Sequence, residues 1–200
     1  MLERVRAAVA WPTVLHALLF VLSLSLAFGC FNGTLFGWHP FAMSVGYIFF
    51  MAEGLISAWA IRTTAGEERV RGLDMHALMQ LRAVVLIAIG AGVIIHNKNL
   101  NGKPHFRTLH GKLGLLTLVL TAASPLLGVV SFRKLGLIQR FPDEWQPRLK
   151  KTHKLLGAAT WFLALLTVEI ALPHKAVHRV RRGARGGCAA GAAGACRGRG

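Results

Sequence analysis

Four histidines are the residues of this chain whose spacing could support chemistry. They are His39, His76, His110 and His153, and each lies within about one helical turn of the start of a different long apolar segment. Successive segments that cross a bilayer run in alternate directions. We therefore expect the first and third histidines at one membrane face and the second and fourth at the other, which predicts two metal centres.

The number and type of these candidate ligands favour haem iron over zinc. A structural zinc site takes four protein ligands, whereas each predicted pair offers two histidines without a cysteine or a ligand carboxylate nearby. Haem iron takes two axial ligands on opposite sides of a flat ring, which two neighbouring helices can supply. One histidine at a helix end is usually an interfacial residue, but four in consecutive segments favour ligands inside the bundle.

A glycine follows two of these histidines on the same helical face. Gly114 lies four residues after His110, and Gly157 lies four residues after His153. The missing side chain would leave room for the edge of a porphyrin. Small residues also let membrane helices pack closely, so both interpretations stay open.

The apolar segments that must position the histidines are long enough to cross a membrane. The 200 residues are 54% hydrophobic and only 16% charged, which is too apolar for an ordinary soluble domain. A bilayer core of about 30 Å needs about 20 helical residues. Five blocks meet this length, at residues 13–31, 40–61, 77–95, 111–131 and 154–172. We expect an all-α, multi-pass membrane protein.

The charges of the loops predict an orientation in the membrane. Lys and Arg gather in the N-terminus and in the second and fourth loops, and are few in the first and third loops. The positive-inside rule therefore predicts a cytosolic N-terminus, with His76 and His153 near the cytosolic face. The first block lacks a clear signal-peptidase site and is expected to be a retained helix.

The C-terminal residues 183–200 differ from the rest of the chain. They are Gly, Ala, Arg and two Cys, a low-complexity basic composition that predicts a disordered tail. This tail inflates the net charge of +16, and the chain shows no basic groove with interleaved aromatics, so no nucleic-acid partner is expected. The three cysteines have neither CxxC nor zinc-site spacing.

Five motifs, in this order, resemble the cytochrome b561 family over about residues 11–175. They are Gly37-Trp38-His39-Pro40, Met51-Ala52-Glu53, His76-x-x-x-Gln80, KPHFRTLHG at 103–111 and Lys151-Thr152-His153. The resemblance implies a transmembrane domain of six helices in which helices two to five form a four-helix core with two haem b groups. It implies His39 with His110 for the non-cytosolic haem and His76 with His153 for the cytosolic haem. The sequence predicts five clear helices, so either the sixth has been lost and replaced by an aberrant end, which we favour, or the tail is a genuine non-cytosolic extension.

The same resemblance implies a transmembrane oxidoreductase. Family members oxidise cytosolic ascorbate and reduce an acceptor across the membrane, either the monodehydroascorbate radical or ferric iron. The redox chemistry belongs to the cofactor, so no side chain is assigned a catalytic role. Two alternatives stay open: a quinol or flavoprotein donor in place of ascorbate, and a non-catalytic helical scaffold in the bilayer. The organelle and a homodimer are left open.

Cationic residues near the predicted haems are candidates for binding haem propionates or the ascorbate anion. On the cytosolic side they are Arg62, Arg69, Arg71, Lys150 and Lys151. Arg62 lies fourteen residues before His76, a spacing that resembles that of the family's propionate-binding arginine, and Arg69 occupies a similar basic position, although any of the five could equally be a positive-inside anchor. On the other side, His96 and His105 are candidates for the acceptor site.

Three charged residues inside the spans are costly unless they are paired or near water. Arg82 is a candidate for pairing with Glu169 or reaching the cytosolic haem, and Glu53 is a candidate for coupling proton movement to reduction. The sequence does not select among these roles. The remaining histidines with no partner at a matching depth are expected to be interfacial or tail residues: His16, His174 and His178.

Overall fold

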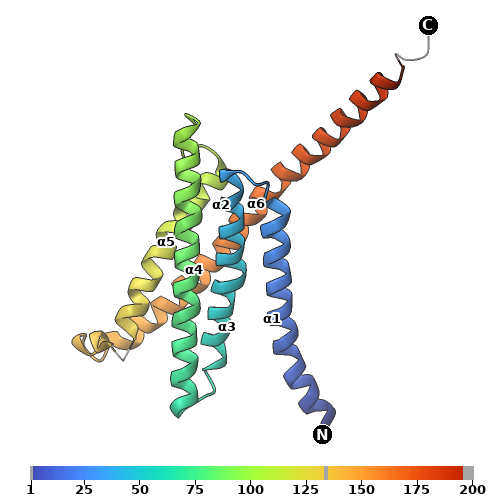
Figure 1. Cartoon of the computed structure of the whole chain (residues 1–200). Coiled ribbons are helices and arrows are strands. Elements are labelled where there is room, and N and C mark those ends of the chain that lie inside the picture. The colour runs from blue at the N-terminus through green and yellow to red at the C-terminus, as the bar shows by residue number, and fades with distance from the viewer. Residues whose placement is uncertain (1, 133–134, 196–200) are drawn as a thin grey trace.

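The structure is a computed structural model that describes the backbone of residues 2–132 and 135–195 and the side chains of residues 13–132 and 135–172. Over these residues the chain forms helices and no strand (Figure 1). The elements are α1 (Leu2–Cys30), α2 (Leu35–Met43), the π-helix η1 (Ser44–Met51), α3 (Ala52–Ala60), α4 (Gly66–Leu100), α5 (Leu109–Ser131), the 3-10 turn η3 (Leu137–Arg140) and α6 (Trp145–Ala195). The segments α2, η1 and α3 follow one another without a break and form one long helix.

Five helices are long and apolar enough to cross a membrane, which confirms the predicted all-α, multi-pass class. The candidate spans are Thr13–Cys30, Leu35–Ala60, Gly66–Leu100, Leu109–Ser131 and Trp145–Leu172. Large apolar side chains on their outer faces are widely exposed, as Leu126 and Phe162 illustrate. Lipid tails are as apolar as these side chains, so such faces need no cover from protein.

Two of the helices begin well before the apolar blocks that revealed them. Because α4 starts at Gly66 and α6 at Trp145, His76 and His153 lie two to three turns inside their helices rather than in the first turn. Glu67 and Glu68 occupy the first turn of α4, where the helix dipole favours carboxylates. Hydropathy therefore marks where a helix enters the apolar layer, and polar residues continue the helix outside it.

The last helix leaves the bundle and continues into the Gly/Ala/Arg tail. The helix α6 extends to Ala195, so residues 183–195 of the tail are part of this helix (Figure 1). Residues 196–200 lie outside the described residues. The disorder expected of the tail and its relation to the family's sixth helix stay predictions.

The bundle core consists of two helical hairpins. In one half, α4 packs along the continuous helix α2–η1–α3, and in the other, α6 packs along α5. Contacts between the halves are sparser and include those of η1 with α6 and of α4 with α5. Helix α1 packs outside the first half, against α2 and η1. The two halves therefore meet less closely than the helices within each half.

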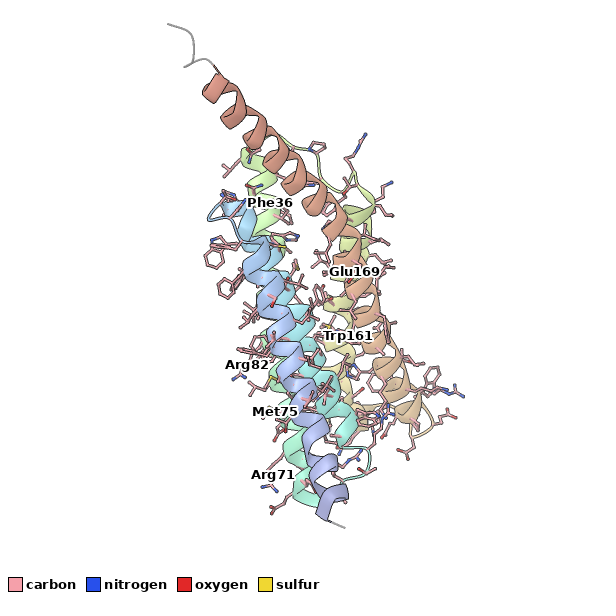
Figure 2. All side chains as sticks on the ribbon, turned by 90° about the vertical axis from the view of Figure 1, so that its right-hand side faces the viewer. Phe36, Arg71, Met75, Arg82, Trp161 and Glu169 are labelled. Carbon is pink, nitrogen blue, oxygen red and sulfur yellow. The ribbon has the colours of Figure 1, made fainter. Side chains whose placement is uncertain are left out.

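Two hydrogen bonds join the halves at mid-height, where Figure 2 shows Trp161, and both involve the buried residue Tyr47. Trp161 on α6 donates through Nε1 to the backbone carbonyl of Tyr47, with N and O 3.0 Å apart. The hydroxyls of Tyr47 and Thr121 on α5 lie 2.9 Å apart. Thr121 donates to the carbonyl of Thr117, so the Tyr47 hydroxyl is the donor in this contact. These bonds fix how far apart the halves lie.

Candidate haem sites

The four histidines meet in two pairs at opposite ends of the bundle. The ring centroids of His39 and His110 are 6.3 Å apart, and those of His76 and His153 are 6.1 Å apart. The ring planes in the two pairs are inclined at 79° and 80°. In each pair one ring comes from the first half and one from the second. The structure thus brings together the partners that alternation through the membrane predicts.

The separation within each pair fits one metal ion bound between the two rings. A metal–imidazole bond is about 2.0 Å long, and atoms of a five-membered ring with bonds of about 1.35 Å lie roughly 1.15 Å from its centre. Two rings that bind one ion from opposite sides therefore have centroids about 6.3 Å apart. Among the described residues no group of three or more His, Cys, Asp or Glu could hold a metal. The donor sets therefore suit the two axial positions of haem iron.

Each of the four rings is oriented by a backbone carbonyl of the helix that packs against its own. In the first half, Nδ1 of His39 lies 3.0 Å from the carbonyl oxygen of Gly90, and Nδ1 of His76 lies 2.7 Å from that of Gly54. In the second half, Nδ1 of His110 lies 2.9 Å from the carbonyl oxygen of Thr167, and Nδ1 of His153 lies 3.1 Å from that of Ser124. A carbonyl can only accept, so Nδ1 carries the hydrogen and Nε2 is the unprotonated nitrogen. This second interaction is the one that metal-ligating histidines ordinarily make. Nothing in the sequence indicated these partners.

The bracing is reciprocal within each half. Helix α4 carries His76 and braces His39 through Gly90, and the helix α2–η1–α3 carries His39 and braces His76 through Gly54. Helices α5 and α6 brace each other in the same way. On α4, α5 and α6 the histidine and the bracing carbonyl are fourteen residues apart. At 1.5 Å per residue, the two sites lie about 21 Å apart along the bundle.

The second span has one residue more between its histidine and its carbonyl, and η1 accommodates that residue. His39 and Gly54 are fifteen residues apart, and Ser44–Met51 between them is π-helical. A π-helical turn contains more residues than an α-helical turn. In a continuous α-helix one additional residue would rotate Gly54 by about 100° relative to His39. The π-helix therefore allows both His39 and Gly54 to face α4, where their partners Gly90 and His76 lie.

Glycines allow close approach at the His76–His153 site. A Cβ on Gly54 would collide with the side-chain amide of Gln80 on α4, and a Cβ on Gly128 would lie 3.0 Å from Cε1 of His153. Gln80 in turn donates to the carbonyl of Met51 at 3.2 Å. A larger side chain would have to displace the Gln80 side chain at Gly54, or the ring of His153 at Gly128.

The glycines after His110 and His153 face the bracing residues. A Cβ on Gly114 would lie 3.8 Å from Thr167, and one on Gly157 would lie 3.5 Å from Ser124. Both contacts lie between α5 and α6, at ordinary van der Waals distance. They support the helix-packing interpretation, and clearance for a porphyrin edge stays a prediction.

The cationic residues predicted to bind propionate or ascorbate gather at the His76–His153 end of the bundle. They follow α3, lie in the first turns of α4, or precede His153 on α6: Arg62, Arg69, Arg71, Lys150 and Lys151. Figure 2 shows Arg71 near this end and Phe36 near the other. Arg69 donates through Nη1 to the carbonyl of Ile61 at 2.8 Å, which closes the C-terminus of α3. The anion-binding roles stay predictions.

The two histidines predicted for the acceptor lie at the other end. His96 is exposed in the last turns of α4. His105 lies in the loop before α5, where Nε2 is 2.7 Å from Oδ1 of Asn99. The same loop is held by Lys98, which donates to the carbonyl of Pro104 at 3.2 Å. Their roles toward an acceptor also stay predictions.

The charged residues inside the spans differ in their surroundings. Nδ1 of His16 on α1 lies 2.6 Å from Oε2 of Glu53, a contact that the sequence did not indicate, and the interfacial position expected for His16 stays a prediction. The guanidinium of Arg82 lies 5.9 Å from the centroid of the Phe50 ring. Glu169 is exposed on α6 and lies apart from Arg82 (Figure 2). The side chains of His174 and His178 lie outside the described residues.

Known proteins match most of this chain. The family of eukaryotic cytochrome b561 matches residues 38–179. Transmembrane reductase CYB561D2 of Bos taurus is 31% identical over 185 residues, which cover 83% of this chain and 78% of the relative. The Mus musculus protein of the same name is 32% identical over 148 residues, 68% of this chain and 64% of the relative. The lysosomal membrane ascorbate-dependent ferrireductase CYB561A3 of Bos taurus is 26% identical over 152 residues, 76% and 55% respectively.

These matches agree with the geometry of the site. The matched segment 38–179 contains all four paired histidines and the carbonyls that brace them. The chain spans less than two thirds of the length of the mouse reductase and the bovine ferrireductase. The predicted family is confirmed: the chain belongs to the eukaryotic cytochrome b561 family, whose members are transmembrane, haem b-dependent reductases.

Proposed function

We propose that this protein is a two-haem transmembrane reductase that takes electrons from ascorbate and passes them to monodehydroascorbate radical or ferric iron. One observation carries the proposal. Two histidine pairs lie about 21 Å apart along the bundle, and each has the ring separation that one six-coordinate iron requires. All four rings are held by carbonyls in the tautomer that leaves Nε2 for the metal.

His39 and His110 would hold one haem b, and His76 and His153 the other. When bound, these haems supply one-electron redox chemistry at iron whose two axial positions are both occupied. The chain itself fixes ring orientation through the four carbonyls and fixes the gap between the halves through Trp161 and Tyr47. Two centres about 21 Å apart divide an apolar layer of about 30 Å into shorter distances.

The loop charges support a direction for the electrons. With the N-terminus in the cytosol, the His76–His153 site faces the cytosol and receives the electron there. Exposed Arg62, Arg71 and Lys151 at this end suit haem propionates and the ascorbate anion. Arg69 and Lys150 belong to the same basic group. At the opposite end, His96 and His105 lie near the route of the acceptor.

The names of two relatives support the donor and one of the acceptors. One is the lysosomal ascorbate-dependent ferrireductase described above. The other is transmembrane ascorbate ferrireductase 2 of Arabidopsis thaliana, 28% identical over 141 residues, 70% of this chain and 58% of the relative. Both names join ascorbate to the reduction of iron, which is the reaction proposed here for ferric substrates.

The number of haems tests the proposal. Protein purified from haem-replete cells is expected to hold two haem b groups per chain, and His39→Ala or His153→Ala is expected to lose one. His96→Ala, a histidine outside both pairs, is the matched control and is expected to keep both. A folded protein that holds fewer than two haems, or that keeps both after His39→Ala, would contradict the site assignment.

Proteoliposomes test the donor and the scaffold alternative. Enclosed ascorbate is expected to reduce external ferric chelate or monodehydroascorbate only when the loaded protein is present, and Arg71→Gln is expected to raise the ascorbate concentration needed. Reduction by a quinol or flavoprotein with no response to ascorbate would instead favour the other donors. Tolerance of Ala at all four paired histidines would favour a scaffold.

A further inference from the structure

A buried glutamate of the second span is paired with a histidine of α1. Oε2 of Glu53 lies 2.6 Å from Nδ1 of His16. The Glu53 side chain is 11% exposed and the His16 side chain 44%. The second carboxylate oxygen, Oε1, is buried and has no hydrogen-bond partner among the described residues. The carboxylate thus has one buried oxygen without a partner among the described residues, whereas the His16 side of the pair is partly accessible.

A pair whose role was only to fasten α1 to the bundle would not need a buried carboxylate with one oxygen that lacks a partner among the described residues. An ionised carboxylate in an apolar layer is costly, and a buried oxygen without a partner adds to that cost. Tyr47 and Thr121 fasten α5 to η1 with uncharged groups that satisfy each other. The charge at Glu53 therefore needs a reason other than packing.

The position of Glu53 connects it to one of the histidine pairs. The next residue, Gly54, provides the carbonyl that braces Nδ1 of His76 at 2.7 Å. A change of charge at Glu53 therefore acts beside the hydrogen bond that orients a proposed haem ligand. In a medium of low dielectric constant, such a charge is poorly screened from the centre.

Few other charges face Glu53. Helix α1 contributes His16, and α4 contributes His76 and Arg82, whose guanidinium lies over the Phe50 ring. The other α4 side chain at this height, Gln80, is neutral. Helix α6 meets η1 through the uncharged indole of Trp161. Among the described residues, His16 is thus the titratable side chain in direct hydrogen-bond contact with Glu53.

We propose that Glu53 and His16 form a proton-binding site that takes up one proton when the His76–His153 centre is reduced. The inference rests on the proposed function. The ascorbate monoanion would lose one electron and one proton to become the monodehydroascorbate radical. The electron would reduce the ferric iron held by His76 and His153 to ferrous iron, and one proton, equivalent to the one that ascorbate releases to the solvent, would bind to the pair. On reoxidation by the acceptor, the electron and this proton both leave.

The charges before and after reduction balance in this scheme. Ionised Glu53 with neutral His16 carries one negative charge, which offsets the single excess positive charge of ferric iron within a porphyrin. After reduction that positive charge is gone, and the protonated pair is neutral overall. Because Oε2 and Nδ1 are 2.6 Å apart, the proton is assigned to the pair and not to one atom. The half-exposed ring of His16 is its point of entry.

Electrochemical titration of the haem-loaded protein tests this without using ascorbate. Proton uptake on reduction means that the midpoint potential falls as pH rises. For the centre that is lost on His76→Ala, a tenfold fall in proton concentration is expected to weaken reduction up to tenfold in wild type. Glu53→Gln and His16→Gln are each expected to remove most of this dependence. Glu169→Gln changes an exposed acid in the α6 span and is the matched control that should keep it.

Each outcome bears on one proposal. An unchanged pH dependence in Glu53→Gln or in His16→Gln with both haems bound would overturn the proton site, as would a wild-type potential independent of pH. If Glu53→Gln fails to bind haem, two other variants decide the question. His16→Gln changes a residue of α1, outside the contact of α3 with α4, and should remove most of the pH dependence. Glu53→Asp keeps a carboxylate and should retain it. Loss of ascorbate oxidation with the pH dependence intact would refute only the donor.

Discussion

Trp161→Phe tests whether the mid-height hydrogen bonds control both histidine pairs. The change removes the indole N–H that donates to the Tyr47 carbonyl at 3.0 Å. Hydrogen bonds between membrane helices contribute about 0.6 kcal/mol on average and up to about 1.7 kcal/mol. The smaller ring leaves a void that costs about 1 kcal/mol more. We expect a loss of about 2 kcal/mol, or a Tm lower by roughly 5 °C.

The effect on the sites should be shared between them. Trp161 and Tyr47 lie about midway between the two pairs, since each is six to eight residues from the histidine or the carbonyl at either end of its helix. A looser joint here lets both gaps widen. We therefore expect the electron paramagnetic resonance signals of both ferric centres to change together in Trp161→Phe, with two haems still bound.

A matched substitution and a clear contrary result make this experiment decisive. Trp59→Phe changes an indole that is 69% exposed on α3, so it should shift Tm by no more than the equivalent of about 0.5 kcal/mol and leave both signals as in wild type. The reasoning is refuted if Trp161→Phe has the same Tm as the Trp59→Phe control, or if the electron paramagnetic resonance signal of only one centre changes.

Three further changes test the register and packing of the helices. Gly54→Ala should push α3 away from α4 and weaken one haem by about 1 to 3 kcal/mol, whereas Gly157→Ala should retain both haems, as measured by haem content after dilution. Deleting Val45 from η1 should preserve both haems, because it gives this helix the fourteen-residue spacing between histidine and carbonyl that the other helices have. Deleting Val119 from α5 shortens that spacing and should lose at least one haem. Two intact haems after the Val119 deletion would argue against a fixed register. Thr108→Ala removes the side-chain cap of α5 and should lower the free energy of unfolding by about 0.5 to 2 kcal/mol, with an unchanged melting curve as the contrary result.

Helix number and histidine pairing could be predicted from the sequence because they depend on the length and order of the apolar blocks. Apolar blocks of membrane length reveal the spans, and alternation of direction is enough to place His39 with His110. The starts of α4 and α6 were misplaced because a helix continues beyond the apolar layer. Residues such as Glu67 favour the helix end for an electrostatic reason that hydropathy does not report.

The second interaction of each ring could not be predicted, because backbone carbonyls are the same in every residue. Which carbonyl faces His76 depends on the axial register of α3 against α4, and the side chain of Gly54 gives no sign of it. The π-helix could not be predicted either, because Ser44–Met51 contains no Pro and resembles any other apolar helical segment. The contact of His16 with Glu53 depends on how α1 packs, which hydropathy alone does not fix.

The reciprocal bracing has a consequence for how the protein assembles. The carbonyl contacts of the four rings lie within the hairpins, and in the proposed function each hairpin supplies one of the two ligands of each haem. Bound haems would therefore join the two hairpins, in addition to the hydrogen bonds of Tyr47 with Trp161 and Thr121. Their binding free energy would then contribute to the free energy of assembly. Cellular haem supply would then set how much of the inserted chain matures, and a hairpin still waiting for haem would be the natural substrate of membrane quality control.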